Sequence, residues 1–246
     1  MSTRPLLDVI GLGKSFYVHE QGKDIPSAGN VHLQVYPGEL TALIGPTGCG
    51  KSTVLKSIYR TYLPNQGQIL YQDAGDRVLD LAQLDEHSVM RLRKGEIRFV
   101  TQFLRFVPRQ KTLDVVAAPL YKQGMRKEAG RHKARELLTR LAIPEHLWTL
   151  PPSTFSGGER QRVNLAQGVI SNPRLLLLDE PTASLDPKTT EEVTRIIDEI
   201  KSWGTGILAV FHNMDLVRCL AEHTVSLELP DAQDAQHVSV DSQVPA

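Results

Sequence analysis

A glycine-rich segment carries the clearest chemical signal in this sequence, because residues 45–52 read Gly-Pro-Thr-Gly-Cys-Gly-Lys-Ser. The segment follows a short apolar run, residues 40–44, and precedes a helix-like stretch from 51 to about 62. At a strand-to-helix junction the pattern G-x-x-x-x-G-K-S predicts a phosphate-binding loop, in which backbone N–H groups and the lysine bind the phosphates and the serine binds Mg2+. The nucleotide-binding residues predicted here are Gly45, Pro46, Thr47, Gly48, Cys49, Gly50, Lys51, Ser52 and Thr53. We expect the thiol of Cys49 to be reactive in an empty loop.

Two adjacent acids end a second apolar run. Residues 175–178 are all leucine, and Asp179 and Glu180 follow directly. A strand that ends beside the phosphate loop would place Asp179 to hold Mg2+, directly or through water, and Glu180 to polarise a water that attacks the γ-phosphate. Two solvated acids at a strand end are the alternative, and the phosphate loop favours the catalytic interpretation.

A third segment, residues 156–161, reads Ser-Gly-Gly-Glu-Arg-Gln. Ser156 with Glu159 three residues later predicts a capping box at the start of a helix. A capped helix N-terminus that contains glycines is also a second site for an anion. One chain therefore offers one phosphate loop and one further anion site.

These three segments together resemble the ABC ATPases, whose signature is Ser-Gly-Gly-Gln or a close variant upstream of an Asp-Glu pair. The resemblance covers about residues 6 to 229. It implies that Ser156, Gly157 and Gly158 contact the γ-phosphate bound to an opposite subunit, so that two chains hold two ATP molecules between them. Glu159, which stands where glutamine is commonest, is assigned to the same contact.

The resemblance assigns roles to further positions. Gln102 matches the glutamine that senses Mg2+ and the attacking water, and His212 matches the histidine that contacts the γ-phosphate; a lone histidine is otherwise more often a packed residue. The segment 184–186, which ends in Asp186, matches one that crosses to the partner subunit. Phe16 matches the aromatic residue that stacks on adenine, with Tyr17 as the alternative. The catalytic residues implied are Glu180, His212 and Gln102, and the Mg2+ ligands are Ser52, Gln102 and Asp179.

The rest of the chain supplies the elements that must position these residues. Short apolar runs alternate with helical patterns, which predicts an α/β fold with a mostly parallel sheet, the P-loop NTPase core of ABC type. The apolar runs are 97–101, 175–178 and 207–211, and the helical patterns are 126–141, 158–170 and 188–203. Residues 6–39 and 67–82 predict a small antiparallel β subdomain.

The predicted organisation is one ATP-binding domain over residues 1–230. A helical subdomain of about residues 103–165 is inserted in it, because that stretch contains no convincing strand. The polar, aperiodic tail 231–246 is predicted to be disordered.

Composition narrows the function classes. Lys and Arg together number 28, as do Asp and Glu, so we expect no nucleic-acid partner. Cys49 and Cys219 are far apart, which argues against a disulfide framework or a zinc site and favours the cytoplasm. No segment has the length and hydropathy of a membrane span, so we expect any membrane contact to come through a partner.

The partner is predicted in two ways. Residues 59–67, 102–109 and 146–155 resemble the ABC ATP-binding subunits of the carbon-phosphorus lyase system for phosphonate catabolism, which implies an accessory role and lyase subunits as partners. The alternative is the energising subunit of a membrane transporter, either an importer or a lipoprotein exporter. Both include a second ATP-binding subunit in a homodimer or a heterodimer.

Overall fold

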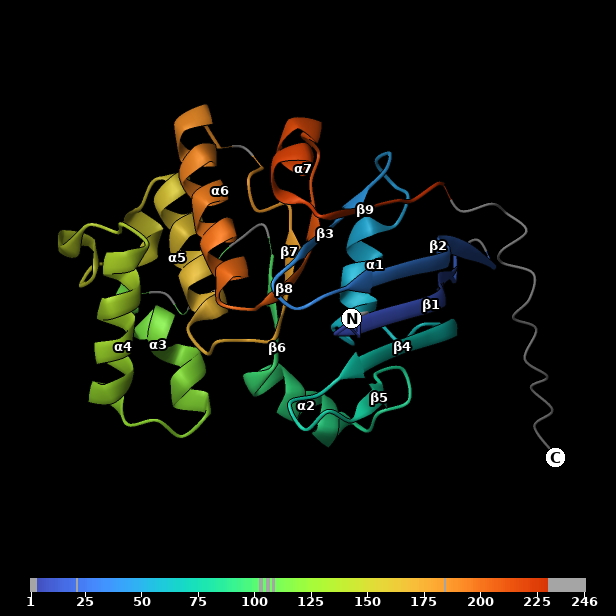
Figure 1. Ribbon diagram of the computed structural model, residues 1–246, viewed down its shortest axis with the longest axis horizontal. Coiled ribbons are helices and arrows are strands. Elements are labelled where there is room, and N and C mark those ends of the chain that lie inside the picture. Colours follow the sequence, from blue (N-terminus) through green and yellow to red (C-terminus); the bar gives the residue numbers. More distant parts are fainter. Residues whose placement is uncertain are drawn as a thin grey trace.

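Two β-sheets form the body of the molecule in the computed structural model, which describes residues 4–20, 22–101, 104, 107, 109–183 and 185–229 (Figure 1). The five-stranded sheet is parallel and has the order β6 (Ile97–Val100), β7 (Leu175–Asp179), β8 (Gly206–Val210), β3 (Leu40–Ile44) and β9 (His223–Ser226). The four-stranded sheet is antiparallel and has the order β2 (Lys23–Val35), β1 (Leu7–Val18), β4 (Gln66–Gln72) and β5 (Val78–Asp80).

The helices occupy both sides of the parallel sheet. They are α1 (Lys51–Ile58), α2 (Glu86–Gly95), α3 (Thr112–Lys122), α4 (Lys127–Arg140), α5 (Gly157–Val169), α6 (Pro187–Ser202) and α7 (Met214–Leu220), with short 3-10 helices at Glu145–Leu147 and Pro152–Thr154. Within the described residues, no helix combines the length and the hydropathy that crossing a bilayer requires.

Strand β7 shows how the sequence builds the core. Its four leucines are fully buried, and alternate side chains of a strand point to opposite faces. Leu176 and Leu178 belong to the apolar cluster that contains residues of α3, α5 and α6. Leu175 and Leu177 belong to a second cluster, formed with α1 and the antiparallel sheet. A continuous apolar run is what a strand buried on both faces requires.

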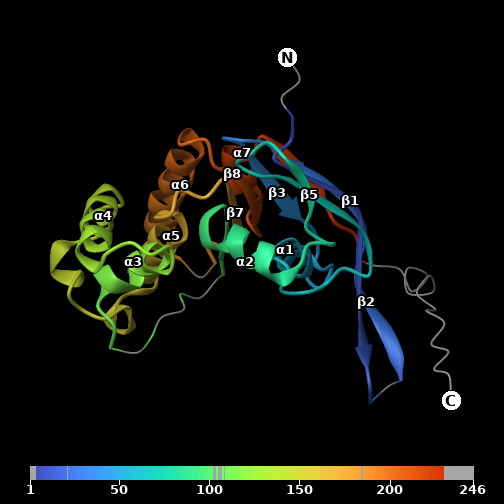
Figure 2. The ribbon, with the colours of Figure 1, turned by 90° about the horizontal axis from the view of Figure 1, so that it is seen from below.

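The fold class is confirmed, because the chain has an α/β core with a parallel sheet, an antiparallel sheet and helices. Figure 2 shows α3, α4 and α5 on one side of the molecule and the β1–β2 hairpin on the other. Between β6 and β7 the described residues form helices and no strand. The bounds of the helical subdomain and of the domain stay predictions, and the tail 231–246 lies outside the described residues.

Four elements differ from the sequence prediction. The helix expected from 51 to about 62 ends at Ile58, while α2, α7 and β9 were not predicted. Helix α2 begins with a local signal that was missed, since the side chain of Asp85 accepts a hydrogen bond from the backbone N–H of Ser88. Strand β9 is short and polar, so its residues lack the apolar run that identified the other parallel strands.

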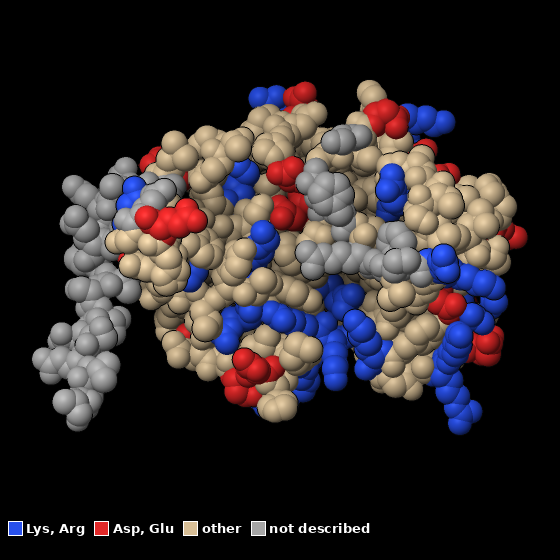
Figure 3. Space-filling model, turned by 180° about the vertical axis from the view of Figure 1, so that it is seen from behind, with Lys and Arg blue, Asp and Glu red and all other residues tan. Residues whose placement is uncertain are grey.

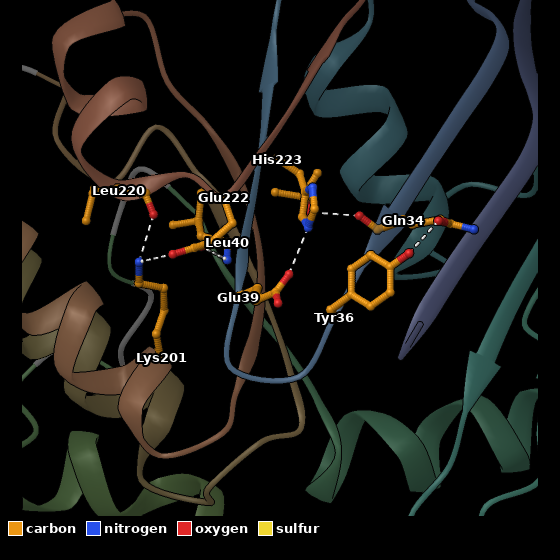
Figure 4. Close-up of polar contacts among 9 residues, drawn as sticks. Gln34, Tyr36, Glu39, Leu40, Lys201, Leu220, Glu222 and His223 are labelled. Atoms are coloured by element: carbon orange, nitrogen blue, oxygen red, sulfur yellow. Dashed lines mark hydrogen bonds and ion pairs between the residues drawn. The ribbon is translucent and has the colours of Figure 1, made fainter. Parts of the chain in front are cut away.

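Polar contacts join the end of α7 to the start of β3 (Figure 4). The carboxylate of Glu222 accepts hydrogen bonds from the Lys201 ammonium group at 2.9 Å and from the Leu40 backbone N–H at 2.7 Å. One residue further on, His223 pairs with Glu39 at 2.8 Å. These contacts hold β9 against β3 although its side chains bury little apolar surface.

Candidate functional site

The glycine-rich loop leaves β3 and packs tightly against β2. Gly50 has a φ of +91°, and a Cβ there would lie 1.8 Å from the carbonyl oxygen of Ser27. Only glycine tolerates both the left-handed backbone and this close approach. The next turn is fixed by a 2.8 Å hydrogen bond between the hydroxyls of Ser27 and Thr53. No side chain caps α1, so its first N–H groups can bind phosphate oxygens.

Lys51 and Cys49 lie on the inner side of this loop. The Lys51 ammonium group is almost buried and donates to the carbonyl oxygens of Gly45 and Pro46, each at 2.8 Å. Cys49 is 1% exposed, and its sulfur lies 3.8 Å from the Lys51 ammonium group. The expectation of a reactive thiol at Cys49 is therefore wrong, because the side chain packs beneath the loop. Pro46, Thr47 and Gly48 form its exposed crest.

Ser52 and Asp179 meet at the base of the loop. The Ser52 hydroxyl donates to Asp179 Oδ1 at 3.0 Å. Burial raises the pKa of Asp179, because a desolvated carboxylate without a cation is disfavoured. Mg2+ takes oxygen ligands and usually needs only one or two from the protein beside phosphates and waters. This hydroxyl and partly desolvated carboxylate fit such an ion.

Glu180 and His212 form the second polar pair. Nε2 of His212 lies 2.6 Å from Oε1 of Glu180, and both side chains are partly exposed. Glu180 has a φ of +54°, a left-handed conformation that costs a non-glycine residue free energy and often occurs at functional sites. The pair is therefore accessible from solvent.

The two aromatic candidates in β1 have different neighbours. The Phe16 ring meets the Tyr62 ring edge-on at 5.0 Å, and the Lys14 ammonium group lies 5.0 Å from its centre. Tyr17 is 55% exposed and contacts His19 instead. Ser15 pairs with Pro26, which places Phe16 close to the β2 segment that packs on the loop. The sequence analysis did not identify Tyr62, whose ring contacts the ring of Phe16.

The signature segment forms the predicted capping box. The Glu159 carboxylate accepts from the Ser156 backbone N–H at 2.9 Å and from its hydroxyl at 2.8 Å. The Glu159 backbone N–H in turn donates to the Ser156 hydroxyl at 3.3 Å. The Ser156 backbone hydrogen bond, followed by the hydroxyl, lowers the pKa of Glu159. The start of α5 therefore carries a negative charge beside the signature serine.

Thr189 connects Asp186 to the start of α5. The Asp186 carboxylate accepts from the Thr189 hydroxyl at 2.6 Å and from its backbone N–H at 3.1 Å. Thr189 also packs on Gly158, where a Cβ would lie 2.4 Å from its methyl carbon. Gly158 is thus required for close packing of α5 on α6, whereas at Gly157 the space is open. The carboxylate of Asp186 caps α6 within its own chain.

The phosphate loop and the signature segment lie on opposite sides of the parallel sheet. Val54 and Leu55 of α1 belong to one apolar cluster, and Val163 and Leu165 of α5 belong to the other. One chain therefore presents two separate anion-binding helix starts. Gln102 and Ser184 lie outside the described residues.

Asn164 is a further residue that the sequence did not identify. Its side chain is 5% exposed and donates to the Thr101 carbonyl at 2.7 Å. The helix that begins at the signature is thereby bonded to the residue before Gln102. The sequence does contain a signal for Asn164, because it is a polar residue on the buried face of the helical pattern 158–170.

Comparisons with known proteins agree with this geometry. A family model described as ABC transporter matches residues 28–183. The lipoprotein-releasing system ATP-binding protein LolD of Hyphomonas neptunium is 34% identical over 87% of this chain and 91% of its own. The macrolide export ATP-binding/permease protein MacB of Marinobacter nauticus is 31% identical over 89% of this chain and 33% of its own. The dimeric ATP-binding cassette MJ0796, bound to ADP and Pi, superposes with a TM-score of 0.80 at 28% identity, over 90% of this chain and 94% of that one.

Proposed function

This chain belongs to the ABC transporter family of ATP-binding ATPases, and on that premise we propose that it energises a membrane permease as one half of an ATP-driven dimer. One observation carries the proposal at the residue level. The pairs Ser52–Asp179 and Glu180–His212 both lie beside the phosphate loop, with separations of 3.0 and 2.6 Å. Such an arrangement suits phosphoryl transfer, where positioning and charge supply most of the catalysis.

The phosphate loop binds the nucleotide in this proposal. Backbone N–H groups at the start of α1 hold the phosphates, and Lys51 exchanges its loop carbonyls for β- and γ-phosphate oxygens. Phe16 stacks on the adenine. Ser52 and Asp179, with Gln102, would hold Mg2+, which neutralises charge on the phosphates when bound.

Glu180 is the proposed general base. Its partly exposed carboxylate accepts the proton of an attacking water, and positioned groups of this kind contribute about 100- to 10,000-fold to a rate. His212 holds that carboxylate in place and contacts the γ-phosphate. Gln102 orients the water.

A second subunit completes the site. Ser156 and the glycines that follow it lie on the opposite side of the sheet from the phosphate loop, which supports a contact with nucleotide held by another chain. Closure of the two subunits on ATP, followed by opening after hydrolysis, would provide the mechanical step. The solved MJ0796 structure is a dimer, which supports the same arrangement here.

The names of the relatives favour a permease as the partner. LolD belongs to a lipoprotein-releasing system, and MacB joins an ATP-binding part and a permease in one chain. The carbon-phosphorus lyase role is a second candidate, which rests on residues 59–67, 102–109 and 146–155 and which the reported relatives do not support.

Identification of the partner tests the two roles. Glu180→Gln should prolong the ATP-bound state, so the tagged variant should be purified with MgATP from cells of the source organism, grown with and without phosphate. We expect an integral membrane permease, with loss of uptake or export of a defined solute in the deletion strain. Recovery of soluble lyase subunits, with loss of growth on phosphonate alone, would contradict the permease role and leave the ATPase intact.

A further inference from the structure

A cleft of about 500 Å3 lies between α4 and the ends of α5 and α6. Figures 1 and 2 show these three helices grouped on one side of the molecule. We refer to this space as the α4–α6 cleft. Its walls include Lys133, Leu137 and Arg140 of α4, Arg174 before β7, and Trp203 and Thr205 before β8.

The α4–α6 cleft is separate from the phosphate loop. Arg174 directly precedes β7 and Thr205 directly precedes β8, so the cleft lies at the amino ends of these two parallel strands. Asp179 is the last residue of β7 and Glu180 follows it, at the carboxyl end of the same strand. A molecule in the cleft would therefore occupy a different site from ATP.

The charged groups of the cleft favour an anion. Lys133 is exposed and Arg174 is half-buried, and neither side chain makes an ion pair or a hydrogen bond within the described part of the chain. Arg140 pairs with Glu199 of α6. Among the described residues that line the cleft, Glu136 is the one carboxylate. Cations without a carboxylate partner can bind the charged group of a ligand.

Arg140 and Trp203 give the cleft a flat and partly apolar wall. The Arg140 guanidinium lies 4.5 Å from the centre of the Trp203 ring. Its side chain is 55% exposed, so much of it remains free to contact a ligand. Leu137 and Trp203 also pack against the apolar cluster of α5 and α6. Because a planar guanidinium stacks on aromatic faces, this wall favours a ligand with an aromatic ring.

We propose that the α4–α6 cleft binds a small aromatic carboxylate, with its charge at Lys133 and Arg174 and its ring against Arg140. Pockets of roughly 300 to 1,000 Å3 bind small molecules through apolar walls and a few polar groups, and this cleft has that size. A protein partner would instead need a contact area of several hundred Å2 on each side. The inference goes beyond the proposed function, since it concerns a second ligand at a second site.

General attraction to surface cations is the competing explanation. Lys and Arg side chains also gather in the lower part of the face shown in Figure 3, where an anion would be attracted without any cleft. Arg91 and Lys94 are exposed cations of α2. Their joint replacement by glutamine is the matched control for replacement of the two cations of the cleft.

Nuclear magnetic resonance of the full chain tests the inference, because the indole N–H of Trp203 reports on the cleft. The chain has two tryptophans, and Trp148→Phe assigns their two indole signals. The probe is benzoate, compared with benzyl alcohol, which has the ring without the charge. We expect benzoate to shift the Trp203 signal and to bind about tenfold more tightly than benzyl alcohol. MgADP should not displace benzoate, since the nucleotide binds at the other end of β7.

Two variants of the cleft measure the role of its cations. Lys133→Gln combined with Arg174→Gln should raise the Kd for benzoate about tenfold or more. Lys133 is exposed, so Lys133→Gln alone should keep the fold and raise the Kd about two- to threefold. Arg91→Gln combined with Lys94→Gln should leave the Kd unchanged.

Four results would overturn the inference. They are an unmoved Trp203 signal, displacement of benzoate by MgADP, an unchanged Kd in Lys133→Gln, and equal weakening by the two double variants. ATP hydrolysis in the absence of benzoate reports on the nucleotide site alone, so failure of the cleft as a binding site leaves the proposed function intact.

Discussion

Glu180 and His212 meet at 2.6 Å although they lie 32 residues apart in the sequence. Strands β7 and β8 explain the contact, since Asp179 is directly opposite Val210 in their parallel register. Each residue of the pair follows the end of its strand, and the carboxyl ends of parallel strands lie at one edge of a sheet. The proposed base and the histidine beside it therefore both lie next to strand ends of the protein core.

The close approach of Gly50 to Ser27 gives a prediction for the phosphate loop. Gly50→Ala should lower the free energy of unfolding by about 1 to 3 kcal/mol more than a matched control, because the added methyl group meets a backbone oxygen. The control is Gly124→Ala, whose φ of +88° causes similar strain in open space. Denaturant unfolding measures the difference, and equal losses in both variants would contradict the described packing.

Asp179 should lower the free energy of unfolding, although ATP hydrolysis should require it. Burial raises its pKa, so ionisation costs the folded state free energy; this cost is fully present above the folded pKa and disappears as the pH falls through it. Asp179→Asn should therefore stabilise the chain at pH 8 by about 1 kcal/mol. The gain should shrink on acidification, and Mg2+-dependent ATP hydrolysis should be lost. If Asp179→Asn instead destabilised the chain at pH 8, the folded protein would favour the ionised form of Asp179, which would contradict this prediction.

The two cysteines should differ in reactivity. Cys219 is exposed and Cys49 is buried, so a maleimide should label Cys219 quickly and Cys49 only after local opening of the loop. Mass spectrometry of the native protein, with Cys219→Ser as the single-thiol control, measures both rates. Rapid labelling of Cys49 in the native chain, suppressed by MgATP, would instead restore the sequence-based expectation of an accessible thiol.

Phe16 and Tyr17 can be separated by their effect on nucleotide affinity. Stacking of a base on an aromatic ring is worth about 1 to 3 kcal/mol, so Phe16→Ala should raise the Kd for ATP roughly tenfold. Tyr17→Ala should leave it nearly unchanged, since Tyr17 contacts His19 instead. Titration with a fluorescent ATP analogue provides the measurement, and the reverse ranking would assign the base to Tyr17.

The sequence predicted the parts of the site that depend on local pattern. The phosphate loop, the acids after β7 and the capping box at Ser156 each have a spacing that reflects one strand end or one helix start. The partners of these residues come from elsewhere in the chain. The Ser52–Asp179 hydrogen bond and the packing of Gly158 on Thr189 depend on which strands and helices are neighbours, and one sequence does not specify that order.

The missed elements have the same cause. Strand β9 is held by Glu222 and by pairing with β3 rather than by its own apolar residues. Helix α2 buries only Val89 and Leu92, which is too short a pattern to identify a helix. The burial of Cys49 depends on how the loop turns over α1, and its sequence position alone suggested exposure.

Turnover of ATP by Glu180→Gln tests the central proposal most directly, because the amide keeps the shape of the side chain and removes its basicity. We expect kcat to fall about 100- to 10,000-fold, with ATP affinity retained and an ATP-dependent dimer trapped on size-exclusion chromatography. Glu191→Gln, an exposed acid on α6, should behave as wild type. Turnover by Glu180→Gln at the wild-type rate would contradict the assignment of Glu180 as the base.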